Sequence, residues 1–180
     1  AEAIVVESPK IPDINPMLAL FDTAVRDEME ASGIPHADID LHLSKWRQDY
    51  PRATFIQEWI EPPSTGFRKI ARVGGEVAGL LKGYISDDAD SYANWLQQLY
   101  IANAARGTGV ADRITNLYLA LANPAASTQV WVLAHNVRAR RFYARHGFVG
   151  VAYNSTMECG RNNYPVVILE RKPQQEIAYS

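Results

Sequence analysis

The stretch YIANAARGTGVADRI, residues 100–114, places a loop of small residues between the end of an apolar strand and the start of a helix. The loop contains Arg106, Gly107 and Gly109 and has no bulky side chain. Glycine lets a ligand approach the backbone closely, and the free N–H groups at a helix start attract anions. An arginine adds charge-assisted hydrogen bonds. The stretch therefore predicts a site for an anion such as a pyrophosphate.

Two other phosphate-binding motifs do not fit this loop. A nucleoside-triphosphate loop needs a lysine after its last glycine, and no lysine follows Gly107 or Gly109. The dinucleotide fingerprint needs a third glycine where this chain has Asp112, whose charge would repel a diphosphate. What remains is the pattern R-x-x-G-x-A, formed by Arg106, Gly109 and Ala111. By itself this pattern is equally compatible with a structural turn before a helix.

The residues around the loop predict a βαβ unit. Residues 94–101 have the pattern of a strand, the loop continues into a helix with one apolar face, and residues 129–134 are typical of a buried strand. A crossover of this length makes the two strands parallel. The alternation of the first strand slips at Gln97-Gln98, which indicates either a β-bulge or uneven burial on both faces.

The N-terminal third predicts one short strand and three helices. Residues 3–7 have the pattern of the strand. We expect Asn15 to cap the first helix, whose apolar stripe stops before Gly33. We expect Asp38 to cap the second helix, and residues 53–60 to form the third, with a strand as the alternative for that segment.

A hairpin and a closing pair of strands complete the predicted sheet. Residues 67–73 and 76–86 are joined by a Gly-Gly turn, which is typical of a hairpin. A helix from Asn136 precedes two antiparallel strands at residues 148–153 and 165–172. The chain therefore predicts an α/β fold, with a mixed central sheet flanked by helices on both faces.

Charge is distributed unevenly along a chain of 180 residues whose net charge is only −2. That balance argues against nucleic acid as the main partner. Residues 1–63 carry a net charge of −7, whereas residues 102–149 carry six arginines and a net charge of +5. The basic segment is consistent with a solvated helix face or with a site for a phosphorylated ligand.

Cysteine usage and hydropathy suggest a cytoplasmic protein. Cys159 is the single cysteine, so no internal disulfide can form, and no Cys/His spacing matches a zinc site. The start AEAIVVESPK lacks the pattern of a signal peptide, and the longest apolar runs are too short to cross a bilayer. We expect no metal and no membrane partner, and a monomer or homodimer.

A second motif, N-x-x-A-x-x-F-Y-x-x-x-G-F, occupies residues 136–148. Together with the loop it resembles the GNAT acetyltransferase superfamily, whose acetyl-CoA motif contains Q/R-x-x-G-x-G/A. The resemblance is specific over residues 76–153 and only general over the N-terminal helices. It implies one GNAT-like N-acetyltransferase domain over residues 1–180. Within it, we expect an acceptor-side helical part at 1–66, an acetyl-CoA-binding core at 67–153 and a C-terminal strand region at 154–180.

The resemblance implies direct transfer of an acetyl group from acetyl-CoA, as co-substrate, to a primary amine in a ternary complex. The pantetheine arm would pair with the edge of the strand between two splayed parallel strands, and a backbone N–H near Leu99 or Tyr100 would stabilise the oxyanion. Tyr143 would be the catalytic acid that protonates the departing thiolate, because a phenol with a pKa near ~10 suits a thiol leaving group. The expected cofactor-binding residues are Leu99, Tyr100, Ile101, Arg106, Gly107, Thr108, Gly109, Val110, Ala111, Asn136 and Tyr143.

Two of these residues also have structural interpretations. Asn136 is equally consistent with a contact to the cofactor and with a helix cap alone. Phe142 and Tyr143 could both pack their helix onto the sheet. The motif favours that packing role for Phe142 and the catalytic role for Tyr143.

The sequence does not decide which group acts as the general base that takes the proton from the amine. Many members of the family carry a glutamate on the strand before the loop, whereas residues 94–100, NWLQQLY, contain no carboxylate. A chain of water molecules could take the proton, or an acid from elsewhere, with Glu58, Glu61, Asp87 and Asp88 as candidates. The acidic N-terminal part favours a cationic acceptor.

We expect the acceptor to be the amine of a small molecule. A protein lysine or N-terminus is the alternative within the same class. A non-catalytic CoA-binding sensor or scaffold is the alternative of another class, supported by the missing strand glutamate and opposed by Tyr143. A nucleotide-dependent enzyme is disfavoured because both nucleotide motifs are broken.

Overall fold

Seven strands form one mixed sheet in residues 2–87 and 93–174, the part of the chain that the structure, a computed structural model, describes. Along the sheet their order is β1-β2-β3-β4-β5-β7-β6, and only the pair β4 and β5 is parallel. The last strand of the chain thus lies between its two predecessors, an order that no local pattern predicts. The strands are β1 (Ile4–Glu7), β2 (Gly66–Val73), β3 (Glu76–Tyr84), β4 (Asn94–Ile101), β5 (Thr128–Leu133), β6 (Val149–Cys159) and β7 (Asn162–Arg171).

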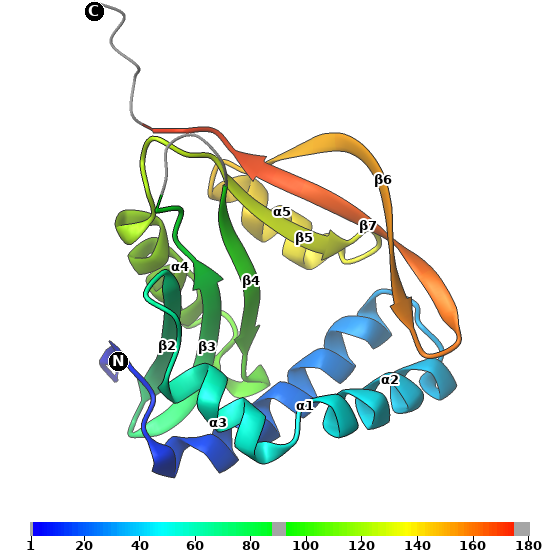
Figure 1. The fold of residues 1–180 in the computed structure, drawn as a ribbon, viewed down its shortest axis with the longest axis horizontal. Coiled ribbons are helices and arrows are strands. Elements are labelled where there is room, and N and C mark those ends of the chain that lie inside the picture. The colour runs from blue at the N-terminus through cyan, green and yellow to red at the C-terminus, as the bar shows by residue number, and fades with distance from the viewer. Residues whose placement is uncertain (1, 88–92, 175–180) are drawn as a thin grey trace, which may run out of the picture.

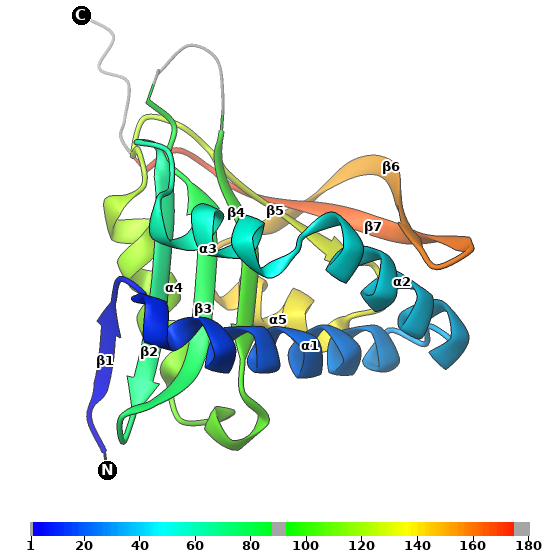
Figure 2. The ribbon, with the colours of Figure 1, turned by 60° about the horizontal axis from the view of Figure 1, so that its bottom comes forward.

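Helices cover both faces of this sheet. Figure 2 shows α1, α2 and α3 in front of one face and α4 and α5 behind the other. This arrangement confirms the predicted α/β fold, whereas the predicted division at residues 66 and 153 stays a prediction. The helices are α1 (Ile14–Ala31), α2 (His36–Asp49), α3 (Arg52–Ile60), α4 (Val110–Leu121) and α5 (Val137–Arg145), with 3-10 turns at Ile11–Asp13 and Asn103–Ala105.

The core has two apolar layers, one on each face of the sheet. The α1–α3 layer contains Phe21, Ile39 and Trp59, all buried. The α4–α5 layer contains Ile114 and Tyr118, which are fully buried. Helical spacing of apolar residues produces both layers, because each stripe faces the sheet.

Two predicted helix caps were wrong. Helix α1 begins at Ile14, so Asn15 lies inside the first turn, because the 3-10 turn at Ile11–Asp13 already carries the chain into the helix. Helix α2 begins at His36, so Asp38 lies in its first turn and does not cap it.

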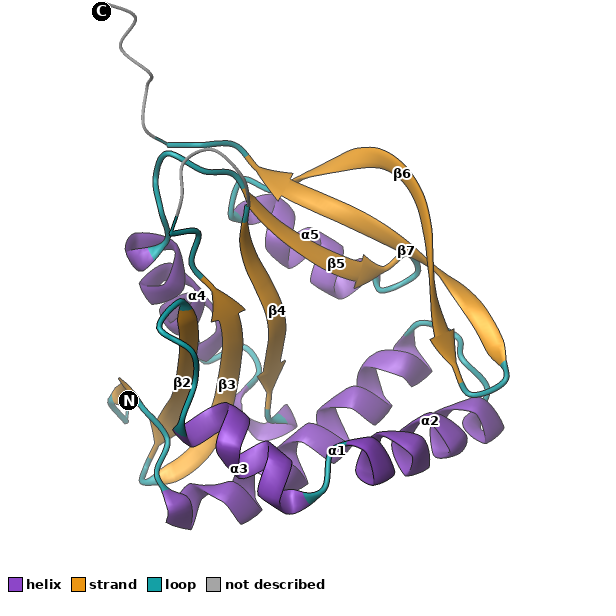
Figure 3. Ribbon diagram, viewed as in Figure 1, coloured by secondary structure: helices purple, strands orange, loops and turns teal. Residues whose placement is uncertain are grey.

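Asp38 instead ties α2 to the β6–β7 hairpin, which reaches that helix in Figure 3. Its carboxylate accepts hydrogen bonds from the Tyr164 hydroxyl, the Asn162 amide (2.9 Å) and the Arg161 N–H (3.1 Å). These donors hold the pKa of Asp38 below its usual value. The ionised carboxylate therefore fastens the end of the hairpin to the helical layer.

Cys159 ends strand β6, where it is fully buried. Its sulfur lies 3.6 Å from that of Met29, and burial raises the pKa of the thiol to about 11. A buried, protonated thiol is a poor nucleophile, so Cys159 is part of the core.

Strands β4 and β5 are paired only at their beginnings. Their last pair is Leu96 with Val130, and beyond it the strands diverge, as Figure 1 shows. On the other edge of β4, pairing with β3 passes from Gln98 directly to Leu96, so Gln97 is an extra residue. This bulge confirms one of the two interpretations of the Gln97-Gln98 slip.

Asn94 holds the paired end of these strands together. It is fully buried, and its Oδ1 accepts hydrogen bonds from the backbone N–H groups of Ser86 (2.9 Å) and Asn123 (3.0 Å). Its Nδ2 donates to the carbonyls of Asn123 (3.0 Å) and Ser127 (3.2 Å). One side chain thus fixes β4 to the segment that leads into β5.

The turn of the β6–β7 hairpin offers a test of how closely this hairpin packs against Asp38 of α2. Gly160 has φ of 65°, and a Cβ there would lie 2.5 Å from the Cα of Asp38. We expect Gly160→Ala to lower the free energy of unfolding by clearly more than the ~1 kcal/mol that positive φ alone costs. Gly75→Ala is the control, because its φ is 81° and nothing lies within 4 Å of the added Cβ. Urea denaturation measures both variants, and equal losses would contradict the packing argument.

Candidate active site

A cavity of about 650 Å³ occupies the gap between β4 and β5. Its wall includes residues of α1 and α2 from one face of the sheet, and residues of α5 and the loop before α4 from the other. The missing strand pairs therefore leave room for a ligand that contacts both faces.

The loop before α4 presents unpaired backbone donors to this cavity. Gly107 and Gly109 have φ of 75° and 88°, and an added Cβ at either would meet nothing within 4 Å. The first bond of the helix runs from the N–H of Arg113 to the carbonyl of Gly109, so the four N–H groups of residues 109–112 precede it. The Arg106 guanidinium lies 3.8 Å from the Asp27 carboxylate. This geometry suits an anion.

The structure brings ten of the eleven predicted cofactor-binding residues to the cavity wall. Thr108 is the exception, and its hydroxyl donates to the Ala105 carbonyl inside the turn. The roles of these residues in binding stay predictions. The ten are Leu99, Tyr100, Ile101, Arg106, Gly107, Gly109, Val110, Ala111, Asn136 and Tyr143.

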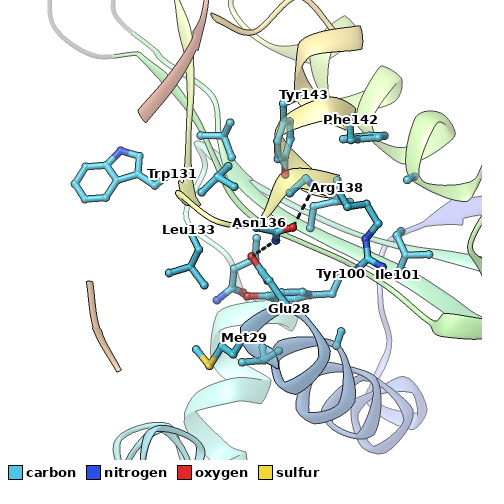
Figure 4. A pocket seen from close by; sticks show the side chains of 18 of the residues that line it. Glu28, Met29, Tyr100, Ile101, Trp131, Leu133, Asn136, Arg138, Phe142 and Tyr143 are labelled. Carbon is cyan, nitrogen blue, oxygen red and sulfur yellow. Dashed lines mark hydrogen bonds between the residues drawn. The ribbon is translucent and has the colours of Figure 1, made fainter. Parts of the chain in front are cut away.

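Asn136 connects two helices. Its Oδ1 accepts a hydrogen bond of 3.2 Å from the Ala139 N–H, which confirms its role as cap of α5. Its Nδ2 donates to Glu28 Oε1 at 3.2 Å, as Figure 4 shows. The cap of α5 therefore also fixes a carboxylate from α1.

Glu28 was not predicted from the sequence. It is partly buried and extends from α1 into the cavity, where Figure 4 shows it close to Asn136 and Tyr100. Burial raises the pKa of Glu28, while the Asn136 amide and the charge of Arg138 act in the opposite direction. The sequence did contain a signal for this residue, because Glu28 falls at helical spacing from Phe21 and places a carboxylate in the apolar stripe of α1.

The candidate bases named from the sequence lie elsewhere. Glu58 forms an ion pair of 3.0 Å with Lys82, and neither Glu58, Glu61 nor Asp87 is part of the cavity wall. Asp88 lies outside the described residues. Within the described part of the chain, the carboxylates on the wall belong to Glu28 and to Asp112, which pairs with His146 at 2.9 Å.

Tyr143 lies on α5 with its hydroxyl directed toward Asn136, as Figure 4 shows. Burial raises the pKa of Tyr143, and the nearby charge of Glu28 raises it further. Burial likewise raises the pKa of Tyr100 on β4. Both phenols therefore stay protonated at neutral pH and can donate a proton or a hydrogen bond.

Residues 2–87 and 93–174 contain no group of three or more His, Cys, Asp or Glu side chains that could hold a metal ion. None of the helices described has the length and apolar character that a membrane span requires.

Comparisons with solved structures show the same fold. PaiA N-acetyltransferase from Thermoplasma acidophilum, in complex with coenzyme A, is similar with a TM-score of 0.74 and 14% identity, over 94% of this chain and 99% of that one. An N-acetyltransferase from Staphylococcus aureus has a TM-score of 0.69 and 16% identity, over 94% and 98%. The ribosomal-protein-S18-alanine N-acetyltransferase from Escherichia coli has a TM-score of 0.65 and 12% identity, over 97% and 96%.

Of the two sequence comparisons, the one with family models agrees with this likeness. No curated protein sequence matches the chain. The family model described as acetyltransferase (GNAT) matches residues 28–148, which include α4, α5 and the gap between β4 and β5. The chain belongs to the GNAT acetyltransferase family.

Proposed function

We propose that this chain transfers an acetyl group from acetyl-CoA to a primary amine by direct attack in a ternary complex. One observation carries the proposal: the gap between β4 and β5 connects the loop before α4, whose geometry suits an anion, on one face with a carboxylate-bearing wall on the other. Membership of the GNAT family and the fold shared with a coenzyme A complex support acetyl-CoA as the donor.

The cavity wall fits the parts of acetyl-CoA. The pyrophosphate would accept hydrogen bonds from the backbone of residues 106–111 at the positive end of α4. The amide groups of the pantetheine arm would pair with β4 beyond Leu96, where the edge that faces β5 has no strand partner. The thioester would then lie between β4 and Tyr143.

The chain's own groups would assist each stage of the transfer. A backbone N–H of β4 would stabilise the charge that develops on the thioester oxygen. As the amine nitrogen bonds to the carbonyl carbon and the carbon–sulfur bond breaks, Tyr143 would donate its proton to the sulfur. Burial keeps the Tyr143 phenol protonated in the free protein but also makes it a weaker acid than a free phenol, so the proposed proton transfer depends on the negative charge that develops on the sulfur beside it.

A small-molecule acceptor is the version that the site favours. Helices α1 and α2 and strands β5, β6 and β7 bound the cavity beyond the gap, and its whole volume is about 650 Å³. The reactive end of acetyl-CoA would take up part of that volume, so the space left for the acceptor is that of a small molecule. A buried single thiol suits a reducing cytoplasm, which we propose as the compartment.

Ligand-dependent melting tests the proposed donor. Acetyl-CoA at a hundredfold excess over its Kd is expected to stabilise the protein by about 2.7 kcal/mol and to raise Tm by several degrees. ATP and NAD serve as controls. The donor assignment fails if acetyl-CoA gives no shift, or none larger than the two nucleotides give.

Tyr143→Phe tests the proposed acid. We expect kcat to fall by ~10²-fold or more with the Kd of acetyl-CoA unchanged, because only proton donation is removed. Tyr50→Phe, whose side chain lies after α2 and outside the cavity wall, is the control. Undiminished turnover in Tyr143→Phe would exclude the role. A wild-type protein that binds acetyl-CoA but acetylates no amine would support the sensor alternative.

A further inference from the structure

On the α1–α2 face, the cavity has an apolar and aromatic wall. Phe21 on α1 and Trp46 on α2 stack with ring centroids 4.4 Å apart. The same Phe21 ring meets Tyr100 of β4 edge-on at 4.9 Å. Met29 and Leu43 lie on this wall as well. The interlocked rings form a rigid surface that suits an apolar ligand.

The part of the cavity on the α1–α2 face of the sheet is one half of it, and the wall opposite these helices in that half is also apolar. Leu133 of β5, Met157 of β6 and Val166 of β7 lie on it. Trp131 also lines the cavity, yet it is 53% exposed. Figure 4 shows Trp131 and Leu133 on the opposite side of β5 from Tyr143. The exposed indole of Trp131 therefore lies at the edge of the half on the α1–α2 face, whereas the loop before α4 lies in the other half.

Charge in this half is confined to one carboxylate. The arginines on the wall, Arg106, Arg138 and Arg145, come from the loop and from α5. His42 of α2 is the remaining basic residue, and burial lowers its pKa, which keeps it neutral. Among the described residues that α1, α2, β6 and β7 contribute to the wall, Glu28 is the one that carries a carboxyl group, and none of them is a lysine or an arginine. The half can therefore match one positive charge and has no partner for a second charge of either sign.

Glu28 lies where the two halves meet. Its carboxylate extends from α1 to the amide of Asn136 at the start of α5, 3.2 Å away. Tyr100 lies beside it on β4, and Tyr143 lies beyond Asn136 (Figure 4). A nitrogen held by Glu28 would therefore face the place between β4 and Tyr143 that the thioester would occupy.

We propose that the acceptor is a primary monoamine with an apolar body, and that Glu28 binds its ammonium group and takes the proton that must leave before attack. This proposal rests on the proposed acetyl transfer. The carboxylate accepts one proton from the ammonium, and the freed lone pair forms the N–C bond as the C–S bond breaks. Tyr143 protonates the sulfur and regains a proton from the nitrogen through solvent, and Glu28 releases its proton to water.

Three amines with the same six-carbon chain test the acceptor class. Hexylamine has one ammonium group, hexane-1,6-diamine adds a second, and 6-aminohexanoate adds a carboxylate. Release of free thiol at neutral pH gives kcat/KM for each. We expect hexylamine to exceed both others at least ~10-fold, because burying an unpaired charge is unfavourable. A diamine or amino acid used equally well, or acetylation of a peptide amine alone, would overturn the acceptor class.

Glu28→Gln tests the role of the carboxylate. We expect kcat/KM for hexylamine to fall by ~10²-fold or more, with the Kd of acetyl-CoA unchanged. Calorimetry with CoA present should show hexylamine binding at least ~10-fold more weakly. The lost activity should recover in part as the pH approaches the pKa of the amine, because the free amine then needs no base. Glu30→Gln is the matched control, since Glu30 lies on the same helix and pairs with His36 outside the cavity wall.

The stability of Glu28→Gln separates a chemical role from misfolding. Burial raises the pKa of Glu28, so the folded protein binds this proton more tightly than the unfolded chain does. The contribution of Glu28 to the stability of the wild type therefore decreases as the pH rises from about 4.3 through the folded pKa. The variant lacks that loss, so its stability relative to the wild type should increase over the same interval.

The outcomes distinguish this proposal from the one on which it rests. If acetyl-CoA raises Tm and amines are acetylated, but Glu28→Gln is as active as Glu30→Gln, the role of Glu28 is wrong and the transfer stands. The role of Glu28 is equally wrong if alkaline pH restores no activity to a stable Glu28→Gln. If acetyl-CoA does not bind, both proposals fail together.

Discussion

The pairing of β4 with β5 ends at Leu96 and Val130, and the arrangement of the site depends on that short register. Unpaired backbone groups inside a sheet are unfavourable, so neighbouring strands normally stay paired. Here the bulge at Gln97 turns β4 away while Asn94 holds its paired end. The resulting edge can be satisfied by a ligand with amide groups of its own. A local irregularity of one residue thus creates the binding gap.

The gap also explains why charge is segregated along the chain. The basic segment of residues 102–149 forms the loop, α4 and α5 on one face, and the helices of residues 1–63 cover the other. The proposed reaction joins an anionic donor and a cationic acceptor, and it needs these opposite environments close together but not mixed. A passage through the sheet achieves this, because each face can be built from a different part of the sequence.

Local patterns in the sequence were sufficient for the order of the helices and strands and for the parallel pair, and they gave the bulge as one of two interpretations. Each depends on residues that are close in the chain, such as the loop with Gly107 and Gly109. The caps assigned to Asn15 and Asp38 were wrong for the opposite reason. A preceding 3-10 turn displaces the first, and the distant β6–β7 hairpin engages the second. Insertion of β7 between β5 and β6 is likewise fixed by packing that no single segment encodes.

In the proposed reaction, Glu28 supplies from α1 the carboxylate that many members of the family carry on the strand before the loop. The strand before the loop has no carboxylate, and its amide Gln97 lines the same cavity as Glu28. The Oε1 of Gln97 is buried without a hydrogen-bond partner in the part of the chain that is described. A glutamate at position 97 would add a carboxylate from β4 to a wall to which α1 already contributes Glu28. The uncharged strand residue is therefore consistent with the proposal that α1, rather than β4, supplies the carboxylate beside the acceptor nitrogen.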